Sequence, residues 1–191
     1  MRRAALVLLA LAATAAAQDR PGESVYFPMT VGTQWVYRSG EGRVYARVTR
    51  AGMLDGELVA RVESWIGDKM LAAEMVAVGA DGLYRRSVSD QRSEPPLRFV
   101  PRDPKRGDRW EVDSKIGPET IKGAFAVTEE EVTVPAGKYK AVVIKSEGLE
   151  VGGKPLVITN WYARGVGPVK TTIKFENQDT TLELEKFETL R

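Results

Sequence analysis

The segment VYARVTR, residues 44–50, alternates apolar and polar side chains along its whole length. In an extended strand, its first, third and fifth side chains lie on one face and the polar residues between them lie on the other. The same period of two recurs at 57–66 and 169–175. Apolar residues on one face with polar residues on the other are typical of antiparallel strands that have one buried face and one solvent-exposed face.

Turn-forming residues separate these segments about every ten positions, as at Asp55-Gly56, Asp81-Gly82 and Gly152-Gly153. Such spacing leaves no room for helices between strands and predicts an all-β, antiparallel protein with roughly ten or eleven strands. The expected architecture is a strongly curved sheet, an open barrel or a two-sheet sandwich. The expected strands are 34–39, 43–50, 57–66, 69–78, 82–89, 109–115, 121–132, 139–148, 156–163, 166–175 and 180–187.

Two segments are harder to assign. Residues 69–78, KMLAAEMVAV, have the composition of a helix, but their position between two turns favours a strand. Residues 90–108 contain four prolines and many charges, and we expect a long loop or the seam between two halves. Each half would begin with a G-x-x-W motif, at Trp35 and at Trp110, which suggests pseudo-repeated halves at about 26–89 and 99–191.

The apolar face changes within one expected strand. Ile121, Phe125 and Val127 are odd-numbered, whereas Val132 and Val134 are even-numbered. A shift of one residue turns every following side chain to the other face. The pattern therefore predicts a β-bulge or a sharp bend within residues 128–131.

The first seventeen residues form a basic start, an apolar core too short to span a bilayer, and a small-residue end. This pattern predicts a signal peptide at 1–17, with cleavage near Ala17-Gln18 and an exported, periplasmic or extracellular protein. Residues 18–191 would form a single β domain with no transmembrane segment. The leader holds two of the 28 basic residues, so 26 basic residues face 26 acidic ones and no global charge favours nucleic acid.

The chain has no His and no Cys. Catalysis by Ser-His-Asp or Cys-His arrangements is therefore impossible, and the usual zinc ligands are missing. We predict no cofactor, no metal and no enzymatic activity. A carboxylate-based hydrolase remains an alternative, because Glu129-Glu130-Glu131 could supply acid–base groups, although a solvated face is the simpler interpretation.

Aromatic residues at strand starts and within strands are the candidate ligand-binding residues: Trp35, Tyr37, Trp110, Trp161 and Tyr162. Packing in the core or at the rim is the usual role of such residues, and lining the mouth of an apolar cavity is the functional alternative. Tyr26 and Phe27 are expected to close the end of the core. A basic cluster spans residues 85–109 and could hold an anion, but interleaved acids favour a self-neutralised loop.

The motifs YFP, DGLYR (81–85), VTVPAGKYKAVVI (132–144) and WYARGVGPVK (161–170) resemble those of DUF3108-like bacterial secreted and lipoprotein domains. The sheets of these domains are similar to the half-barrels of the LolA/LolB lipoprotein carriers. The resemblance implies a many-stranded antiparallel sheet, an envelope location and no established activity. This chain lacks the lipobox Cys of the lipoprotein members and a helix to fill a half-barrel.

These observations predict non-catalytic binding of an apolar or amphipathic small molecule or lipid in the concave face of the sheet. The main alternative is a structural module that docks to another envelope protein through a sheet edge or an apolar patch. The carboxylate hydrolase is the second alternative, and it requires two acidic side chains that converge in a cleft.

Overall fold

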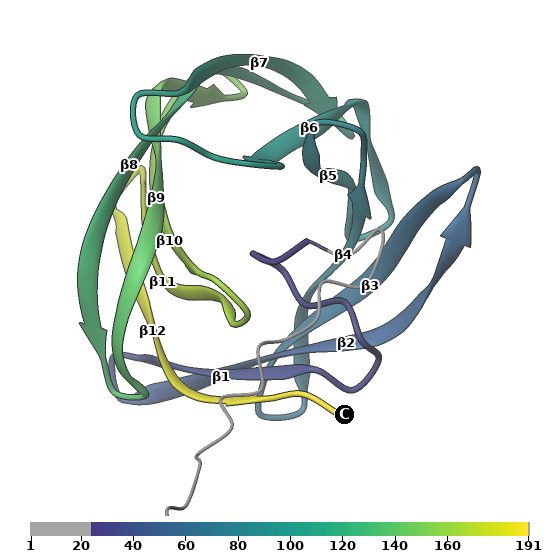
Figure 1. Ribbon diagram of the computed structural model, residues 1–191. Helices are drawn as coiled ribbons and strands as arrows, with labels where there is room; N and C mark the ends of the chain where they lie inside the picture. Colours follow the sequence, from purple (N-terminus) through teal and green to yellow (C-terminus); the bar gives the residue numbers. More distant parts are fainter. Residues whose placement is uncertain (1–23, 191) are drawn as a thin grey trace, which may run out of the picture.

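The computed structural model describes residues 24–190, and in this range twelve antiparallel strands form a closed barrel (Figure 1). Each strand pairs with its neighbours in sequence, and the first strand also pairs with the last. The predicted all-β, antiparallel class is confirmed. The closure differs from the open arrangements that were expected, because β1 and β12 pair from Gln34↔Glu188 to Arg38↔Glu183.

The strands lie in chain order around the barrel and are joined by short turns. Their bounds are β1 Gln34–Ser39, β2 Gly42–Leu54, β3 Glu57–Ile66, β4 Lys69–Val78, β5 Gly82–Val88, β6 Gln91–Pro101, β7 Arg109–Ile116, β8 Glu119–Val134, β9 Gly137–Val151, β10 Lys154–Ala163, β11 Gly167–Phe175 and β12 Gln178–Glu188.

The twelfth strand arises where a loop was expected, because residues 91–101 form β6. Proline has no N–H to donate and normally sits at strand edges. Here β6 contains Pro95 and Pro96, and it pairs with β7 only through Ser93↔Ile116 and Glu94↔Lys115 among the described residues. The strand tolerates its prolines because one of its two edges makes few backbone hydrogen bonds. The ambiguous segment 69–78 is strand β4, as expected.

The bulge predicted within residues 128–131 is misplaced. Pairing of β8 with β9 runs without a shift from Ala124↔Glu147 to Val134↔Gly137, and the irregularity lies between Lys122 and Ala124. The side chain of Val134 is nevertheless buried on the face opposite to Val127. The end of this hairpin contacts β12, because Ala136 N–H donates to the Leu184 carbonyl over 2.8 Å. We attribute the change of buried face to packing of the hairpin end rather than to a register shift.

The first described residues enter the barrel at one end (Figure 1). The Phe27 ring lies 5.4 Å from Trp35 and 6.2 Å from Phe99, between centroids. The Val25 carbonyl accepts a hydrogen bond of 2.7 Å from Gly165 N–H, in the turn between β10 and β11. The entering chain and this turn therefore fill one part of the barrel interior with aromatic side chains.

The leader predicted at 1–17 lies outside the described residues. Among residues 24–190, no helix has the length and hydropathy that crossing a bilayer requires. The duplication of the two halves stays a prediction.

Candidate functional site

Two of the five predicted binding residues, Trp35 and Tyr37, lie on the inner face of β1 and are buried. Trp35 Nε1–H donates to the Val166 carbonyl over 2.6 Å, and its ring packs 6.0 Å from Phe187. Tyr37 Oη donates to the Pro168 carbonyl over 2.9 Å. Both polar atoms are satisfied by backbone, so these residues join β1 to β11 and their polar ends are not free for a ligand.

Trp110 is buried at the contact between β6 and β7, away from the cluster around Trp35. Its Nε1–H donates to the Arg98 carbonyl over 3.1 Å, and the Arg98 guanidinium lies 5.4 Å from its ring centroid. Phe125 on β8 packs against it at 5.5 Å. Trp110 therefore joins two strands that share little backbone pairing, which is a structural role.

Trp161 and Tyr162 are neighbours on β10, so their side chains point to opposite faces of the sheet. Trp161 is partly exposed; its Nε1–H donates to Glu130, and the Lys170 ammonium lies 5.6 Å from its ring centroid. Tyr162 is only 5% exposed and faces the interior. Of the five candidates, the structure brings Tyr37 and Tyr162 together inside the barrel, where their hydroxyls interact electrostatically.

Two charged residues accompany these tyrosines, Arg85 on β5 and Glu74 on β4. Arg85 Nε–H donates to Glu74 Oε2 over 2.9 Å, and the guanidinium lies 5.3 Å from the Phe99 ring centroid. Both charges act on Tyr162 from the far side of the barrel. An ion pair between inward-facing strands thus lies opposite a buried tyrosine.

The pKa values in this cluster follow from its burial. Burial raises the pKa of Tyr162, with Arg85 opposing and Glu74 adding to the increase. Burial also raises the pKa of Tyr37, and Tyr162 adds to that effect. Burial lowers the pKa of Arg85, but Glu74 outweighs this effect and the net pKa is raised. At neutral pH the two tyrosines are therefore neutral donors and Arg85 is a cation.

The interior around the ion pair is not completely filled. Arg85 and Glu74 keep 27% and 31% of their side-chain surfaces accessible, although they face inward. Among the described residues, no group forms a hydrogen bond with Tyr162 Oη, and the terminal nitrogens of Arg85 have no hydrogen-bond acceptor. These atoms keep some accessible surface, so water or a ligand can be their partner; the fully buried side-chain atoms without a partner in the described chain are Arg86 Nε and Ser93 Oγ instead.

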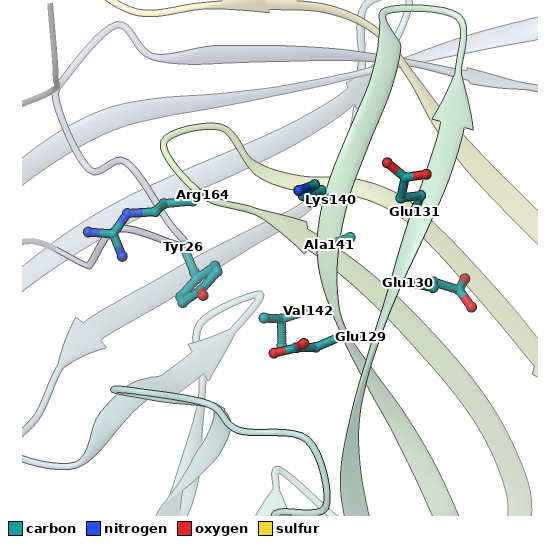
Figure 2. A pocket seen from close by; sticks show the side chains of 8 residues that line it. All are labelled: Tyr26, Glu129, Glu130, Glu131, Lys140, Ala141, Val142 and Arg164. Atoms are coloured by element: carbon teal, nitrogen blue, oxygen red, sulfur yellow. The ribbon is translucent and has the colours of Figure 1, made fainter.

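A cavity of about 410 Å³ reaches Val142, the strand neighbour of Tyr162, although Arg85, Glu74 and Tyr162 are not among its lining residues (Figure 2). Val142 is part of its wall, and this residue pairs directly with Tyr162 on one side and with Glu129 on the other. Directly paired residues of antiparallel strands point to the same face of the sheet. Figure 2 shows the Tyr26 ring directed toward Val142 and Glu129, with Arg164 beside it. The cavity wall thus continues the row of side chains that contains Tyr162. The lining residues are Tyr26, Glu129, Glu130, Glu131, Lys140, Ala141, Val142 and Arg164.

Arg85 and Glu74 were not proposed as site residues from the sequence. Parity along β5 is the signal that could have identified Arg85, because it lies two positions after the buried Leu83 and so shares its apolar face. No comparable signal exists for the meeting of Arg85 with Tyr162, which depends on closure of the barrel.

The three residues of the acidic run on β8, Glu129, Glu130 and Glu131, all line the cavity, and two of them have side-chain partners. Glu130 accepts from Trp161, and Glu131 forms a 2.7 Å ion pair with Lys138. The inward carboxylate of Glu74 is held by Arg85 and not by a second carboxylate. The described residues contain no group of three or more side chains suited to hold a metal ion.

The basic cluster at 85–109 is partly neutralised, mostly by partners outside its own segment. Besides Arg85, three arginines of the cluster pair with carboxylates of other segments: Arg86 with Glu57, Arg98 with Asp81 over 2.5 Å, and Arg109 with Glu147 over 2.9 Å. Lys105 and Asp103, 3.6 Å apart, are the one pair within the segment that was expected from its interleaved acids.

Several large apolar side chains are exposed at hairpin ends. Ile66, Met70 and Leu71 lie around the β3–β4 turn, and Met53 and Leu54 lie at the β2–β3 turn. Exposed apolar residues are common on soluble proteins, and these positions do not identify a partner. Docking to another envelope protein stays a prediction.

Comparisons with known proteins show a likeness in fold. No family model and no curated protein matches the sequence. A solved structure of a candidate lipoprotein from Parabacteroides distasonis superposes with a TM-score of 0.56 at 13% identity, covering 86% of this chain and 99% of that one. A candidate exported protein with a YmcC-like fold from Bacteroides fragilis gives 0.46 at 15% identity, covering 87% and 100%. Neither description names an enzymatic activity. The chain therefore shares its antiparallel β architecture with a bacterial candidate lipoprotein, and the resemblance to DUF3108-like domains stays a prediction.

Proposed function

We propose that this protein is an exported, non-catalytic binding protein that holds an amphipathic small molecule or lipid inside its barrel. The observation that carries the proposal is the incomplete filling of the interior at Arg85 and Glu74, together with a cavity of about 410 Å³ whose wall includes Val142, the strand neighbour of Tyr162. A volume of this size lies within the range of small-molecule sites, which runs from about 300 to 1,000 Å³.

The chemistry of the surrounding surface favours a ligand with one apolar part and one polar part. Val142 and Ala141 contribute apolar wall next to Tyr162, and the Phe99 ring lies beside Arg85. The unsatisfied donors of Tyr162 and Arg85 lie on the same inner surface. An apolar wall with a few convergent polar groups is the usual composition of a small-molecule site.

Catalysis has less support, because the two chemically distinctive inner groups neutralise each other. Glu74 and Arg85 form an ion pair of 2.9 Å, and the chain has no His or Cys to act as base or nucleophile.

The proposed location outside the cytoplasm rests on the leader pattern at 1–17. N-terminal sequencing of protein from the envelope fraction should start at Gln18, and recovery of the uncleaved chain from the cytosol would contradict export.

Binding is tested with a neutral apolar fluorophore, N-phenylnaphthylamine, and by native mass spectrometry of the protein purified from its own envelope. We expect saturable fluorescence enhancement and a co-purifying adduct. Val142→Trp should abolish both, because the indole would fill the cavity beside Tyr162.

The matched control is Lys145→Trp, three residues further along β9 and exposed on the other face. It should bind like the parent protein, and circular dichroism should show both variants folded. A parent protein that binds neither the fluorophore nor any co-purifying molecule would overturn the proposed function.

A further inference from the structure

We infer that Arg85 and Tyr162 bind the carboxylate head group of a singly charged amphipathic ligand, with Glu74 acting as a positioning residue. This inference rests on the proposed function, and it identifies the chemical class of the ligand. It begins from Tyr162, a tyrosine that is 5% exposed and whose hydroxyl has no partner among residues 24–190.

The hydroxyl of Tyr162 is a hydrogen-bond donor under all ordinary conditions. Burial raises its pKa, so the phenol keeps its proton at neutral pH. Its neighbour Tyr37 is also buried but gives its proton to the Pro168 carbonyl over 2.9 Å. The two residues can be compared directly. The Tyr37 hydroxyl has an acceptor in the protein, whereas none is found for the Tyr162 hydroxyl among residues 24–190.

The second donor is the guanidinium of Arg85. Its Nε–H is engaged by Glu74 over 2.9 Å, whereas no acceptor for its terminal nitrogens is found among residues 24–190, and 27% of the side-chain surface stays accessible. A guanidinium offers its donors in a planar arrangement that matches the two oxygens of a carboxylate. Glu74 and the Phe99 ring together fix the orientation of that plane.

The charges disfavour a head group with more than one negative charge. Arg85 and Glu74 sum to zero, and Tyr162 is neutral. Bringing a doubly charged phosphate beside Glu74 would place like charges together in an interior with little water, which is unfavourable. A carboxylate carries a single charge, so its desolvation costs less than that of a doubly charged phosphate, and its two oxygens can accept from both sets of donors.

A matched series of head groups tests the inference: laurate, lauryl alcohol and laurylamine, each displacing N-phenylnaphthylamine at pH 8. The parent protein should bind laurate at least about tenfold more tightly than the alcohol, the effect of one charge-assisted hydrogen bond. Tyr162→Phe should weaken laurate about three- to tenfold and leave the alcohol almost unchanged, because it removes a single donor.

Tyr37→Phe is the control for Tyr162→Phe. It removes a hydroxyl that the fold itself uses, so it should lower the melting temperature while keeping the preference for laurate. Tyr162→Phe should melt like the parent protein, because its hydroxyl has no hydrogen-bond partner within residues 24–190. The double variant with Arg85→Met and Glu74→Gln should bind laurate and the alcohol equally, and it avoids leaving Glu74 as an unpaired charge.

The outcomes separate the two proposals. Equal binding of laurate and the alcohol by the parent protein, or no effect of Tyr162→Phe on laurate, would overturn the head-group inference and leave the proposed function intact. Preference for laurylamine would also overturn it, because Glu74 would then be the head-group ligand. Failure of the parent protein to bind the neutral fluorophore would instead overturn the proposed function.

Discussion

The β8–β9 hairpin and the β6–β7 contact are two neighbouring pairs of strands in one barrel, and they are held together by different forces. Strands β8 and β9 pair along nearly their whole length, from Ile121↔Val151 to Val134↔Gly137. Strands β6 and β7 pair at only two positions within the described chain, Ser93↔Ile116 and Glu94↔Lys115. In Figure 1 the hairpin forms one long wall, and β6 and β7 complete the ring.

Side chains replace the missing backbone bonds at the β6–β7 contact. Trp110 Nε1–H donates to the Arg98 carbonyl over 3.1 Å, and Ser114 Oγ donates to the Pro95 carbonyl over 2.7 Å. Both acceptors are backbone carbonyls of β6, and both donors are side chains of β7. The comparison teaches that closure of this barrel depends on individual side chains at one place and on backbone pairing elsewhere.

The largest expected effect is that of Trp110→Ala, which should lower the free energy of unfolding by about 3–5 kcal/mol. It removes a buried ring between the two poorly paired strands and leaves the Arg98 carbonyl without its donor. Denaturant unfolding followed by circular dichroism measures the loss. Trp161→Ala, on a well-paired strand and partly exposed, is the control and should cost clearly less. Equal losses would show that the β6–β7 contact has no special dependence on Trp110.

Gly123→Ala tests the hairpin, and we expect it to cost about 2 kcal/mol more than Gly137→Ala. Both glycines have positive φ, +145° and +137°, so both substitutions are strained. A Cβ at Gly123 would meet the backbone of Leu149 at 2.6 Å, whereas one at Gly137 would meet nothing within 4 Å. Unfolding curves of the two variants give the difference directly. Similar stabilities would mean that the hairpin relaxes around the new Cβ.

Ser114→Ala should lower the free energy of unfolding by about 1 kcal/mol, because it removes one hydrogen bond across the β6–β7 contact. Hydrogen exchange should show faster local opening of β7. Thr171→Val is the control, since Thr171 Oγ1 donates to Asn160 Oδ1 over 2.9 Å within the continuous pairing of β10 with β11. The amides of β10 and β11 should stay protected in that variant. Unchanged exchange in β7 would contradict the dependence of this contact on side chains.

The smallest expected effect is electrostatic and lies at the other closure, between β1 and β12. Glu183 accepts from Arg38 over 3.0 Å and from Lys170 over 3.1 Å, and these hydrogen bonds lower its pKa below 4.5. A lowered folded pKa stabilises the protein above the unfolded pKa, and this stabilisation is lost as the pH falls through the folded pKa.

Glu183→Gln should therefore cost less than about 1 kcal/mol at pH 7, and the difference from the parent protein should shrink below pH 4.5. Urea midpoints measured from pH 7 down to pH 3 give this difference. A difference that does not change with pH would show that the carboxylate contributes no net charge interaction.

The strand content could be predicted because alternation is a local property. Residues 44–50 place their apolar side chains on one face whatever surrounds them, and β2 follows that pattern. Residues 91–101 could not be predicted in the same way, because their prolines indicate a loop and only an unpaired strand edge accommodates them. The face change near Val132 was visible in the sequence, but its cause is a contact with β12.

The candidate site was predictable only in part, for the same reason. Tyr37 and Tyr162 were candidates because aromatic residues within strands were singled out, and closure of the barrel brings them together. Trp161 was a candidate on the same grounds, yet its neighbour Tyr162 takes the inner face and Trp161 the outer one. Parity within a strand fixes which residues share a face, but not which face becomes the interior.

The amino-acid sequence by itself determined the pleated segments, the turns between them and the exclusion of chemistry that needs His or Cys. Only the tertiary structure decided that the sheet closes through β1 and β12, and that Arg85 and Glu74 act electrostatically on Tyr162 across its interior. The physical reason is the distance along the sequence over which each feature is determined. Strand alternation and turn conformation are set by neighbouring residues, whereas the meeting of β4, β5 and β10 requires the whole chain to have curled upon itself.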